Sequence, residues 1–372
     1  MARIAFVGVG DISGIYLKNI THLFDGLEVV GVCDLVREKA EKAAREYSIP
    51  KLYENMHELF ADPQVDIVLN LTRPNEHYKV TKAALEAGKH VYSEKPLAAE
   101  VGQGRELLLL AESRGLWLCG APDTFLGAGQ QGCRRLLEEG LIGRPVGAAA
   151  HMICRGHESW HPDPAFYYEA PGGGPLLDMG PYYITALVNL LGPVRSVMGM
   201  TKISFPRRGI TSEPLAGTDI GVSVPTCAMA LLHFRSDALA TLFVTFDVFS
   251  MPGVNNIEIY GTKGNMIVPD PNNFGGEIQI KLGEANAPNA AEVPGGGRWI
   301  PIDSPYDAYG ENSRALGLAD MVSAMREGRS ARASAAQMLH VLEVLQAVSR
   351  SSESGKEVDI EAPFAPAPRM AL

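Results

Sequence analysis

Apolar runs and amphipathic stretches alternate over the first third of the chain. Near-continuous apolar runs predict strands over residues 3–7, 27–34, 66–72, 89–95 and 116–121. The stretches between them predict helices over residues 12–24, 37–47, 55–61, 75–88 and 99–114. Strands that are buried on both faces read as continuous apolar runs, so this alternation predicts a parallel sheet with helices on both sides. We therefore expect an α/β, Rossmann-type domain with a doubly wound sheet over residues 1–122.

The pattern changes beyond residue 122. A helix over 126–140, a strand over 145–155, a polar loop over 156–175 and a helix over 176–191 come first. Longer strand-like runs follow over 194–205, 226–234, 238–248, 257–262 and 264–270, with glycine-rich turns such as GTKG between some of them. Helices over 311–327 and 334–354 close the pattern, whereas 284–301 and the tail APFAPAPRMAL read as loops, the tail being loosely held. Residues 123–372 thus predict an α+β domain with a large, mostly antiparallel open sheet.

Composition narrows the classes of function. A chain of 372 residues exceeds what one core usually supports, and 46% apolar with 20% charged residues is ordinary for a globular protein. The net charge of −10 argues against a nucleic-acid partner, because phosphates are neutralised by clustered Lys and Arg. The basic doublets Arg134–Arg135 and Arg207–Arg208 are interpreted as solvated faces.

Targeting and redox signals predict a cytoplasmic protein. The five cysteines are scattered without a CxxC pair, as expected for reduced thiols. The amino terminus, MARIAFVGVGD, enters a strand and a glycine turn at once and does not read as a signal peptide. The sequence holds no run of about 18 apolar residues, so we expect no membrane span.

A glycine-rich turn between the first strand and the first helix predicts a nucleotide site. Gly8 permits the tight turn, and Gly10 lets the backbone approach a pyrophosphate at the helix N-terminus, where N–H groups and the helix dipole favour an anion. Ser13 stands at the third glycine position of this fingerprint and is small enough for close packing. The residues expected to hold the cofactor here are Gly8, Gly10, Asp11, Ile12 and Ser13.

The acidic residue that ends the second strand bears on the choice of cofactor. A carboxylate at Asp34 accepts both ribose hydroxyls and repels a 2′-phosphate, so NAD is favoured over NADP. Arg37 lies close enough in sequence to bind a 2′-phosphate, which keeps NADP as the alternative. The alternative to cofactor binding is a structural role, in which Asp34 caps the end of the strand.

Four segments together resemble the glucose–fructose oxidoreductase/inositol dehydrogenase/MocA (GFO/IDH/MocA) family of sugar dehydrogenases. The segments are VGVGDIS, NLTRPNEHYKVTKAALEAGKHVYSEKP, LLDMGPYYITAL and IEIYGTKGNMIV, and the resemblance covers almost the whole chain. The long segment that ends in Glu-Lys-Pro is the most specific of the four.

The resemblance implies that Lys95 contacts the nicotinamide ribose and the reacting hydroxyl, and that Glu94 reaches the ribose. Chemistry supports this role, because a preorganised cation beside a developing alkoxide lowers the pKa of the hydroxyl. Thr72 and Asn75 are expected to approach the cofactor. His77 matches a family position on the nicotinamide side, with a structural role as an equal alternative.

Asp178 and Tyr182 complete the expected catalytic set. They are four residues apart, so one face of a helix presents both. Most members of the family carry His where Tyr182 stands, and a phenol with an ordinary pKa near 10 is a poor base at neutral pH. Either Tyr182 is the acid/base group, with its pKa depressed by Lys95 and NAD, or it orients the hydroxyl while Asp178 or water carries the proton.

The polar loop contains HESWH, which spells a zinc-protease motif. That motif works only on a helix, yet Gly156 precedes it and Pro162 and Pro164 follow it. We interpret it instead as a substrate loop without a metal, with Trp160 stacking on a sugar ring and polar side chains binding hydroxyls; a structural loop is the alternative. The expected polar contacts are Arg155, His157 and His161, together with Asp123, which stands where many relatives carry a substrate-binding arginine.

These features predict an NAD-dependent dehydrogenase that oxidises a hydroxyl of a sugar or polyol. Xylose, glucose, apiose and cyclitols are equal candidates for the substrate. The alternatives are an enzyme that retains NAD while it eliminates a glycoside, a non-catalytic NAD sensor, and a zinc hydrolase built on HESWH. The apolar run LFVTFDVF on the open sheet predicts a homodimer or homotetramer.

Overall fold

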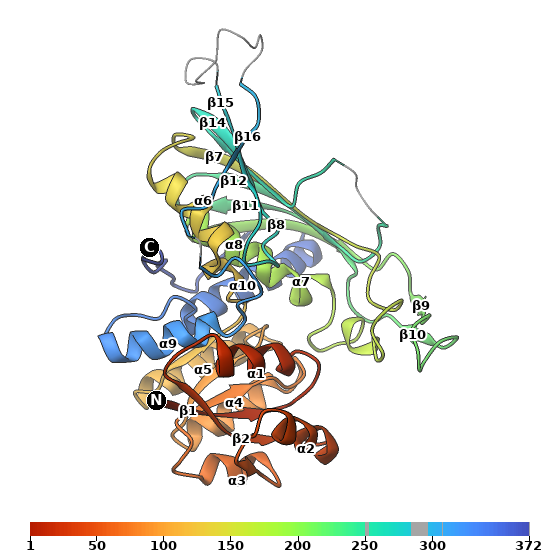
Figure 1. Ribbon diagram of the computed structural model, residues 1–372. Helices are drawn as coiled ribbons and strands as arrows, with labels where there is room; N and C mark the ends of the chain where they lie inside the picture. The colour runs from red at the N-terminus through yellow and green to blue at the C-terminus, as the bar shows by residue number, and fades with distance from the viewer. Residues whose placement is uncertain (250–252, 284–296, 307, 372) are drawn as a thin grey trace. The chain divides into compact units, whose positions relative to one another are not determined.

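The computed structural model, shown in Figure 1, describes residues 1–249, 253–283, 297–306 and 308–371. The chain forms two compact units. Unit 1 comprises Met1–Asp123 and Asn312–Leu342, and unit 2 comprises Thr124–Glu311 and Glu343–Leu372. The structure therefore differs from the predicted division at residue 122, which assigned 312–342 to the second domain.

Unit 1 is built on a six-stranded parallel sheet in the order β3-β2-β1-β4-β5-β6. Its strands are β1 (Ala2–Val7), β2 (Leu27–Cys33), β3 (Lys51–Leu52), β4 (Ile67–Asn70), β5 (His90–Ser93) and β6 (Leu118–Gly120). Every residue of β4 is buried, which explains its continuous apolar pattern. The strand order reverses direction between β1 and β4, the type of switch point where doubly wound sheets bind ligands. The predicted α/β fold is confirmed.

The helices expected in the first part of the chain are all present in unit 1. They are α1 (Ser13–His22), α2 (Arg37–Glu46), α3 (Met56–Ala61), α4 (His77–Glu86) and α5 (Val101–Ser113). The later helix α9 (Leu316–Glu327) also belongs to this unit. Its N-terminal residues are fixed to Asp123, whose Oδ2 accepts hydrogen bonds from the N–H groups of Ala315 at 3.0 Å and Gly317 at 3.1 Å.

Unit 2 contains a nine-stranded sheet in the order β16-β15-β14-β13-β7-β12-β11-β8-β17. The strands are β7 (Pro145–Ile153), β8 (Val194–Lys202), β11 (Cys227–Phe234), β12 (Leu239–Thr245), β13 (Ile257–Gly261), β14 (Gly264–Val268), β15 (Ile278–Leu282), β16 (Ile300–Ile302) and β17 (Val358–Asp359). Among the strands that the structure describes in this sheet, only the pairing of β7 with β12 is parallel, so the predicted mostly antiparallel sheet is confirmed. A separate two-stranded ribbon joins β9 (Arg207–Gly209) to β10 (Asp219–Gly221).

Helices cover one face of the large sheet (Figure 1). They include α6 (Ala128–Glu138), α7 (Pro175–Asp178), α8 (Gly180–Leu191) and the later part of α10 (Ala335–Ser354), with short 3₁₀ turns η1 (Thr124–Leu126) and η2 (Ala165–Tyr167). The other face exposes large apolar side chains, namely Met198, Met200, Met229, Leu231 and Leu239. An open apolar face was expected, but Leu242, Val244 and Phe246 of the quoted run LFVTFDVF are buried, because alternate residues of a strand point to opposite faces.

The predicted helix over 176–191 is interrupted at Met179, which separates α7 from α8. Pro181 has no N–H and cannot bond to the carbonyl of Leu177, so the helical ladder is broken there. The N–H of Tyr182 bonds instead to the carbonyl of Met179 at 3.1 Å. Asp178 and Tyr182 therefore do not lie in one regular helix, and their spacing of four residues does not place them on a shared face.

The two predicted loops differ from expectation in different ways. Residues 284–296 lie outside the described residues, and the end of the expected loop forms β16. The C-terminal tail has no regular structure, but it is held by side chains and is not loosely attached. Gln131 Oε1 accepts a hydrogen bond from the N–H of Met370 at 2.7 Å, and Glu138 pairs with Arg369 at 3.0 Å. Among the described residues, none of the helices has the length and apolar character to cross a membrane.

The side chain of Asp123 is completely buried and also binds Arg314 Nη1 at 3.2 Å, so its removal should destabilise the fold. We expect Asp123→Ala to lower the free energy of unfolding by about 3 kcal/mol or more, since a buried guanidinium and two N–H groups lose their acceptor. Urea denaturation measures the change. The matched control, Asp237→Asn, removes the charge of an exposed carboxylate that pairs with His233 and suits the positive φ of this position, so it is expected to stay within about 0.5 kcal/mol of the wild type. Equal effects of the two substitutions would contradict the prediction.

Candidate active site

The residues predicted to bind the cofactor gather at the carboxyl edge of the unit 1 sheet. Gly8 follows β1, Asp34 follows β2, Leu71 and Thr72 follow β4, and Glu94 follows β5. Backbone hydrogen bonds extend the sheet past the strand ends, from the N–H of Gly8 to Cys33 O and from the N–H of Glu94 to Asn70 O, both at 2.9 Å. This edge is where ligands of doubly wound sheets bind.

The turn after β1 has the shape that a dinucleotide requires. Gly8 has φ of +93°, and a Cβ there would lie 2.8 Å from the carbonyl oxygen of Leu71, so only glycine fits. A Cβ at Gly10 would meet nothing within 4 Å, which leaves the backbone open to a pyrophosphate next to α1. Ser13 is accommodated at the third glycine position because its hydroxyl donates to Gly10 O at 2.6 Å. Asp11 and Ile12 lie in the same turn and are exposed.

Asp34 is tied to this turn by its side chain. Its Oδ2 accepts a hydrogen bond from the N–H of Val9 at 2.7 Å, and its Oδ1 accepts one from the N–H of Val36, also at 2.7 Å. Each carboxylate oxygen can accept a second hydrogen bond, so the capping role does not exclude contact with ribose hydroxyls. Arg37 pairs with Glu41 at 3.0 Å and with Glu54 at 2.5 Å, so its guanidinium is already engaged by carboxylates.

Lys95 and Glu94 follow β5 directly. Glu94 is buried, and its carboxylate accepts hydrogen bonds from the hydroxyl of Tyr16 at 2.9 Å and from the N–H of Lys95 at 3.0 Å. Burial, together with the charge of Glu94, raises the pKa of Tyr16 well above its ordinary value, so this phenol stays a donor. The carboxylate therefore fixes the backbone from which the Lys95 side chain, which is partly exposed, extends.

His77 is a buried clamp between two loops. Its Nδ1 lies 2.7 Å from Pro96 O and its Nε2 lies 2.9 Å from Thr72 O. Burial lowers the pKa of His77, although the two carbonyls act in the opposite direction. This geometry favours the structural interpretation of His77, because both ring nitrogens bind protein carbonyls. Of its neighbours, Thr72 donates its hydroxyl to Asn70 Oδ1 at 2.7 Å, and Asn75 is exposed.

In unit 2 the structure brings together two predicted site residues that are far apart in sequence. His157 Nε2 lies 3.0 Å from Asp178 Oδ2, and the two side chains are only 12% and 14% exposed. Tyr182 is buried near the start of α8. Its neighbour Tyr183 is also buried, and its hydroxyl accepts a hydrogen bond from Asn256 Nδ2 at 2.8 Å.

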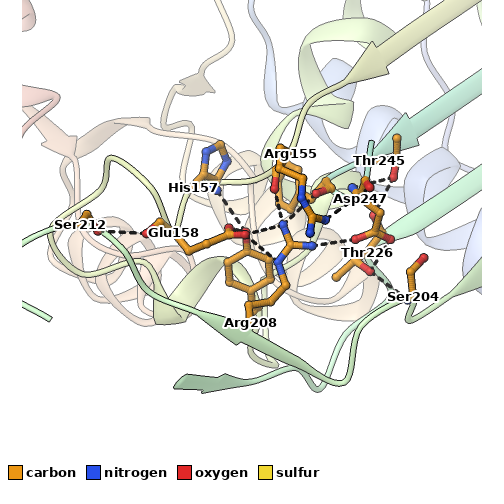
Figure 2. A network of polar contacts seen from close by, with 11 residues as sticks. Arg155, His157, Glu158, Ser204, Arg208, Ser212, Thr226, Thr245 and Asp247 are labelled. Carbon is orange, nitrogen blue, oxygen red and sulfur yellow. Dashed lines mark hydrogen bonds and ion pairs between the residues drawn. The ribbon is translucent and has the colours of Figure 1, made fainter. Parts of the chain in front are cut away.

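The loop that carries His157 is anchored by a buried guanidinium (Figure 2). Arg208 is 3% exposed and lies 2.6 Å from Glu158 Oε1 and 2.9 Å from Asp247 Oδ1. It also donates to Phe246 O at 2.9 Å and to Arg155 O. The interpretation of Arg208 as part of a solvated face is therefore wrong. No local sequence pattern indicates these contacts, because Glu158 and Asp247 lie far from Arg208 along the chain.

Tyr168, which directly follows η2, completes this network. Its hydroxyl donates to Glu158 and accepts a hydrogen bond from the N–H of His157 at 3.0 Å. Burial and the adjacent carboxylate raise the pKa of Tyr168. Gly156, with φ of +99°, packs so tightly against Tyr168, Glu158 and Arg208 that a side chain there would collide with all three.

HESWH forms a turn, as expected, and not a helix. Its glutamate is neutralised by Arg208. Its two histidines bind different partners: His157 pairs with Asp178, and His161 Nδ1 accepts a hydrogen bond from the N–H of Asp163 at 3.0 Å. These contacts do not suit a zinc hydrolase, in which both histidines and the glutamate would serve one metal. Among the described residues, no group of three or more His, Cys, Asp or Glu side chains is arranged to hold a metal ion.

The remaining predicted substrate residues fall into two groups. Trp160 is 61% exposed, with its ring 5.2 Å from that of His157, and Arg155 lies between the rings of Phe205 and Phe249, 4.7 Å from each. Trp160 is thus exposed at the surface of unit 2, whereas Arg155 is partly exposed. Asp123, by contrast, is buried inside unit 1, and its contact with Arg314 and α9 argues against the expected contact with substrate.

Comparison with known proteins adds independent evidence. Residues 2–119 match the oxidoreductase family with an NAD-binding Rossmann fold, and residues 131–267 match the GFO/IDH/MocA C-terminal domain. The chain is 30% identical over 158 residues to inositol 2-dehydrogenase/D-chiro-inositol 3-dehydrogenase of Lactiplantibacillus plantarum, a match that covers 39% of this chain and 42% of that relative, less than half of its length. It is 29% identical over 279 residues to 1,5-anhydro-D-fructose reductase of Ensifer adhaerens, covering 70% and 77%.

A solved structure has the same fold over nearly the whole chain. Levoglucosan dehydrogenase in complex with NADH and levoglucosan superposes with a TM-score of 0.79 at 21% identity, covering 97% of this chain and 100% of that one. At this identity the similarity establishes the fold.

The buried ion pairs of Arg208 with Glu158 and Asp247 should contribute to the stability of the fold. We expect Arg208→Met to lower the free energy of unfolding by about 3–5 kcal/mol, because it leaves two buried carboxylates without their cation. The control is Arg207→Met, which removes the exposed neighbour on the same strand and is expected to change stability by less than about 0.5 kcal/mol. Urea unfolding of both variants provides the measurement, and comparable losses in the two would refute the buried role of Arg208.

Proposed function

Because the chain belongs to the GFO/IDH/MocA family of oxidoreductases, we propose that it is an NAD-dependent dehydrogenase that oxidises a hydroxyl of a sugar or cyclitol. The observation that carries the proposal is the convergence of the glycine turn, Asp34 and Glu94–Lys95 at one edge of the unit 1 sheet. The names of the relatives, inositol dehydrogenase and anhydrofructose reductase, support a polyhydroxylated substrate.

Each residue then has a defined task. Gly8, Gly10 and the first turn of α1 hold the pyrophosphate, and Asp34 accepts the hydroxyls of the adenosine ribose. Bound NAD would supply the hydride acceptor. Lys95 stabilises the negative charge that develops on the reacting oxygen. For the proton two assignments stay open: either Tyr182 is the acid/base group, or Tyr182 orients the hydroxyl while Asp178 or water carries the proton. Trp160 and Arg155 contact the rest of the sugar.

The preference for NAD over NADP rests on two contacts. Asp34 presents a carboxylate where a 2′-phosphate would lie, and Arg37 is held by Glu41 and Glu54. A guanidinium that already has two carboxylate partners gains little from a phosphate. NAD is therefore the proposed cofactor.

We also propose that the protein is a homodimer or homotetramer that assembles through the open face of the large sheet. Met200 is 80% exposed on this face, and its neighbours Met198, Met229, Leu231 and Leu239 form an apolar surface with it. A contiguous apolar surface on a sheet is typical of a subunit interface. A second copy of the chain offers the matching apolar face.

A substrate panel tests the proposed activity. Aldoses and cyclitols, with xylose, glucose, apiose and inositol among them, are assayed with NAD and with NADP by absorbance of the reduced cofactor. Turnover with NAD supports the proposal. Cofactor that is bound but never reduced with any substrate would favour a sensor, and NAD that stays bound through gel filtration while a glycoside is cleaved would favour the retained-cofactor enzyme.

Lys95→Ala tests the assignment of the catalytic cation. We expect kcat to fall by about 100-fold or more, because the charge on the reacting oxygen loses its partner. NAD affinity, measured by fluorescence titration, is expected to stay within about threefold, because the pyrophosphate and adenosine contacts are unchanged. Lys79→Ala removes an exposed lysine paired with Glu76 and serves as the control, with activity unchanged. A Lys95→Ala variant with wild-type kcat would refute the role.

Light scattering tests the proposed assembly. The double substitution Met200→Glu and Leu231→Glu places charges on the open face and is expected to convert the oligomer into monomers. Leu109→Glu is the matched control, because Leu109 is an exposed apolar residue on α5 of unit 1. A wild-type protein that is monomeric, or an oligomer that survives the double substitution, would contradict the assignment of this interface.

A further inference from the structure

His157 lies on an irregular loop, yet its ring is as closely packed as a core side chain. The ring of Tyr167 lies 4.1 Å from it, that of Phe246 4.7 Å and that of Trp160 5.2 Å. Only 12% of the side chain is exposed. Three aromatic rings therefore hold the imidazole in one orientation.

The contact with Asp178 fixes the protonation pattern of this imidazole. Asp178 Oδ2 lies 3.0 Å from Nε2, and a carboxylate can only accept a hydrogen bond. Nε2 therefore carries the hydrogen, and in the neutral ring Nδ1 holds the lone pair that can take a proton. A carboxylate in this position both selects the tautomer and stabilises the imidazolium that forms.

The backbone of the loop is held as firmly as the ring. The N–H of His157 donates to the Tyr168 hydroxyl at 3.0 Å, Tyr168 donates to Glu158, and Glu158 pairs with Arg208. Figure 2 shows these groups converging on the guanidinium. The carbonyl of Glu158 also accepts hydrogen bonds from the N–H groups of Thr211 and Ser212. The network thus positions His157 against Asp178. Its members Tyr168, Glu158 and Arg208 have no assigned role in the proposed reaction.

We propose that the proton released by the oxidised hydroxyl is finally held by His157, with Asp178 as the carboxylate that orients it. The inference rests on the proposed function. The carbon–hydrogen bond breaks and its electron pair leaves with the hydrogen as hydride, for which bound NAD would be the acceptor. The O–H bond breaks as the carbonyl forms, and the proton passes to Nδ1. The imidazolium then returns its proton to water. An ordinary imidazole, with a pKa of about 6.5, accepts and releases protons near neutral pH, which a phenol with a pKa of about 10 does not.

Among the charged groups around His157, Asp178 is the one in contact with its imidazole ring. The titratable and charged groups that face the ring or its backbone are Asp178 from α7, Tyr167 from η2, Tyr168 after it, and Glu158 with Arg208 from the network; His161 lies behind the rings of Trp160 and Tyr167. The charges of Glu158 and Arg208 offset each other. The carboxylate of Asp178 is the one in direct contact with the imidazole.

His157→Gln tests this role through the pH dependence of the reaction. In the wild type we expect kcat for oxidation to fall along a limb on the acid side of neutral pH, as the imidazole becomes protonated. His157→Gln is expected to lose this limb and to lower kcat by about 100-fold, with KM little changed. His57→Gln makes the same chemical change at an exposed histidine on α3 and is expected to keep the wild-type profile. A His157→Gln variant that keeps both the limb and the wild-type kcat overturns the inference but not the proposed function.

A second measurement needs no activity. The imidazole nitrogen signals of His157 are assigned in the NMR spectrum of the protein without cofactor by their loss in His157→Gln. In the neutral ring the hydrogen is expected on Nε2, because Asp178 Oδ2 accepts it. Asp178→Asn is expected to change the nitrogen chemical shifts of this ring, because the carboxylate acceptor is lost. A hydrogen on Nδ1 in the wild type, or nitrogen shifts that stay the same in Asp178→Asn, overturns the pairing of His157 with Asp178. If the wild type oxidises no sugar or cyclitol, the proposed function fails, and these signals alone still decide the pairing.

Discussion

A charge that leaves water must meet an opposite charge inside the protein, and this constraint shapes the irregular parts of both units. In unit 1 the buried Asp123 binds Arg314 and the first N–H groups of α9, and so connects the end of the Rossmann strands to a segment almost two hundred residues later in the chain. In unit 2 the buried Arg208 binds Glu158 and Asp247. A single unmatched partner would cost several kcal/mol, so each contact fixes the backbone on both of its sides.

The nucleotide-binding edge of unit 1 and the polar loop of unit 2 use this constraint in different ways. The nucleotide-binding edge is formed mainly by backbone, since a pyrophosphate is bound by N–H groups at a helix N-terminus and a turn without side chains. Gly8 and Gly10 provide the space, and Asp34 and His77 hold the flanking loops. The candidate residues of unit 2 are side chains on a loop, which has no ladder of backbone hydrogen bonds to keep it in place. The Arg208 network takes over that task, and it does so with buried charges instead of regular hydrogen bonds.

How far the sequence predicts this molecule depends on whether the relevant contact is local. The sheets, the glycine turn and the position of Lys95 follow from alternation and from motifs whose residues are neighbours in sequence. Arg208 was interpreted as solvated because its partners, Glu158 and Asp247, are about forty to fifty residues away, and no local pattern reports a contact over that distance. The break at Met179 was missed for a different reason. Pro181 is tolerated in the first turn of a helix, and only the structure shows that α8 begins anew at Gly180.

The pentapeptide HESWH shows how the surroundings decide the chemistry of a motif. On a helix its two histidines would share one face, and its glutamate would be the base of a metal site. Here the flanking glycine and prolines turn the chain, so that His157 and His161 bind different partners, and the glutamate is neutralised by a buried guanidinium. Once Glu158 is neutralised, the negative charge nearest to His157 comes from Asp178 on α7. The imidazole is thereby coupled to a carboxylate of the proposed substrate site, and the same five residues that would form a metal site on a helix form a histidine–aspartate pair on this loop.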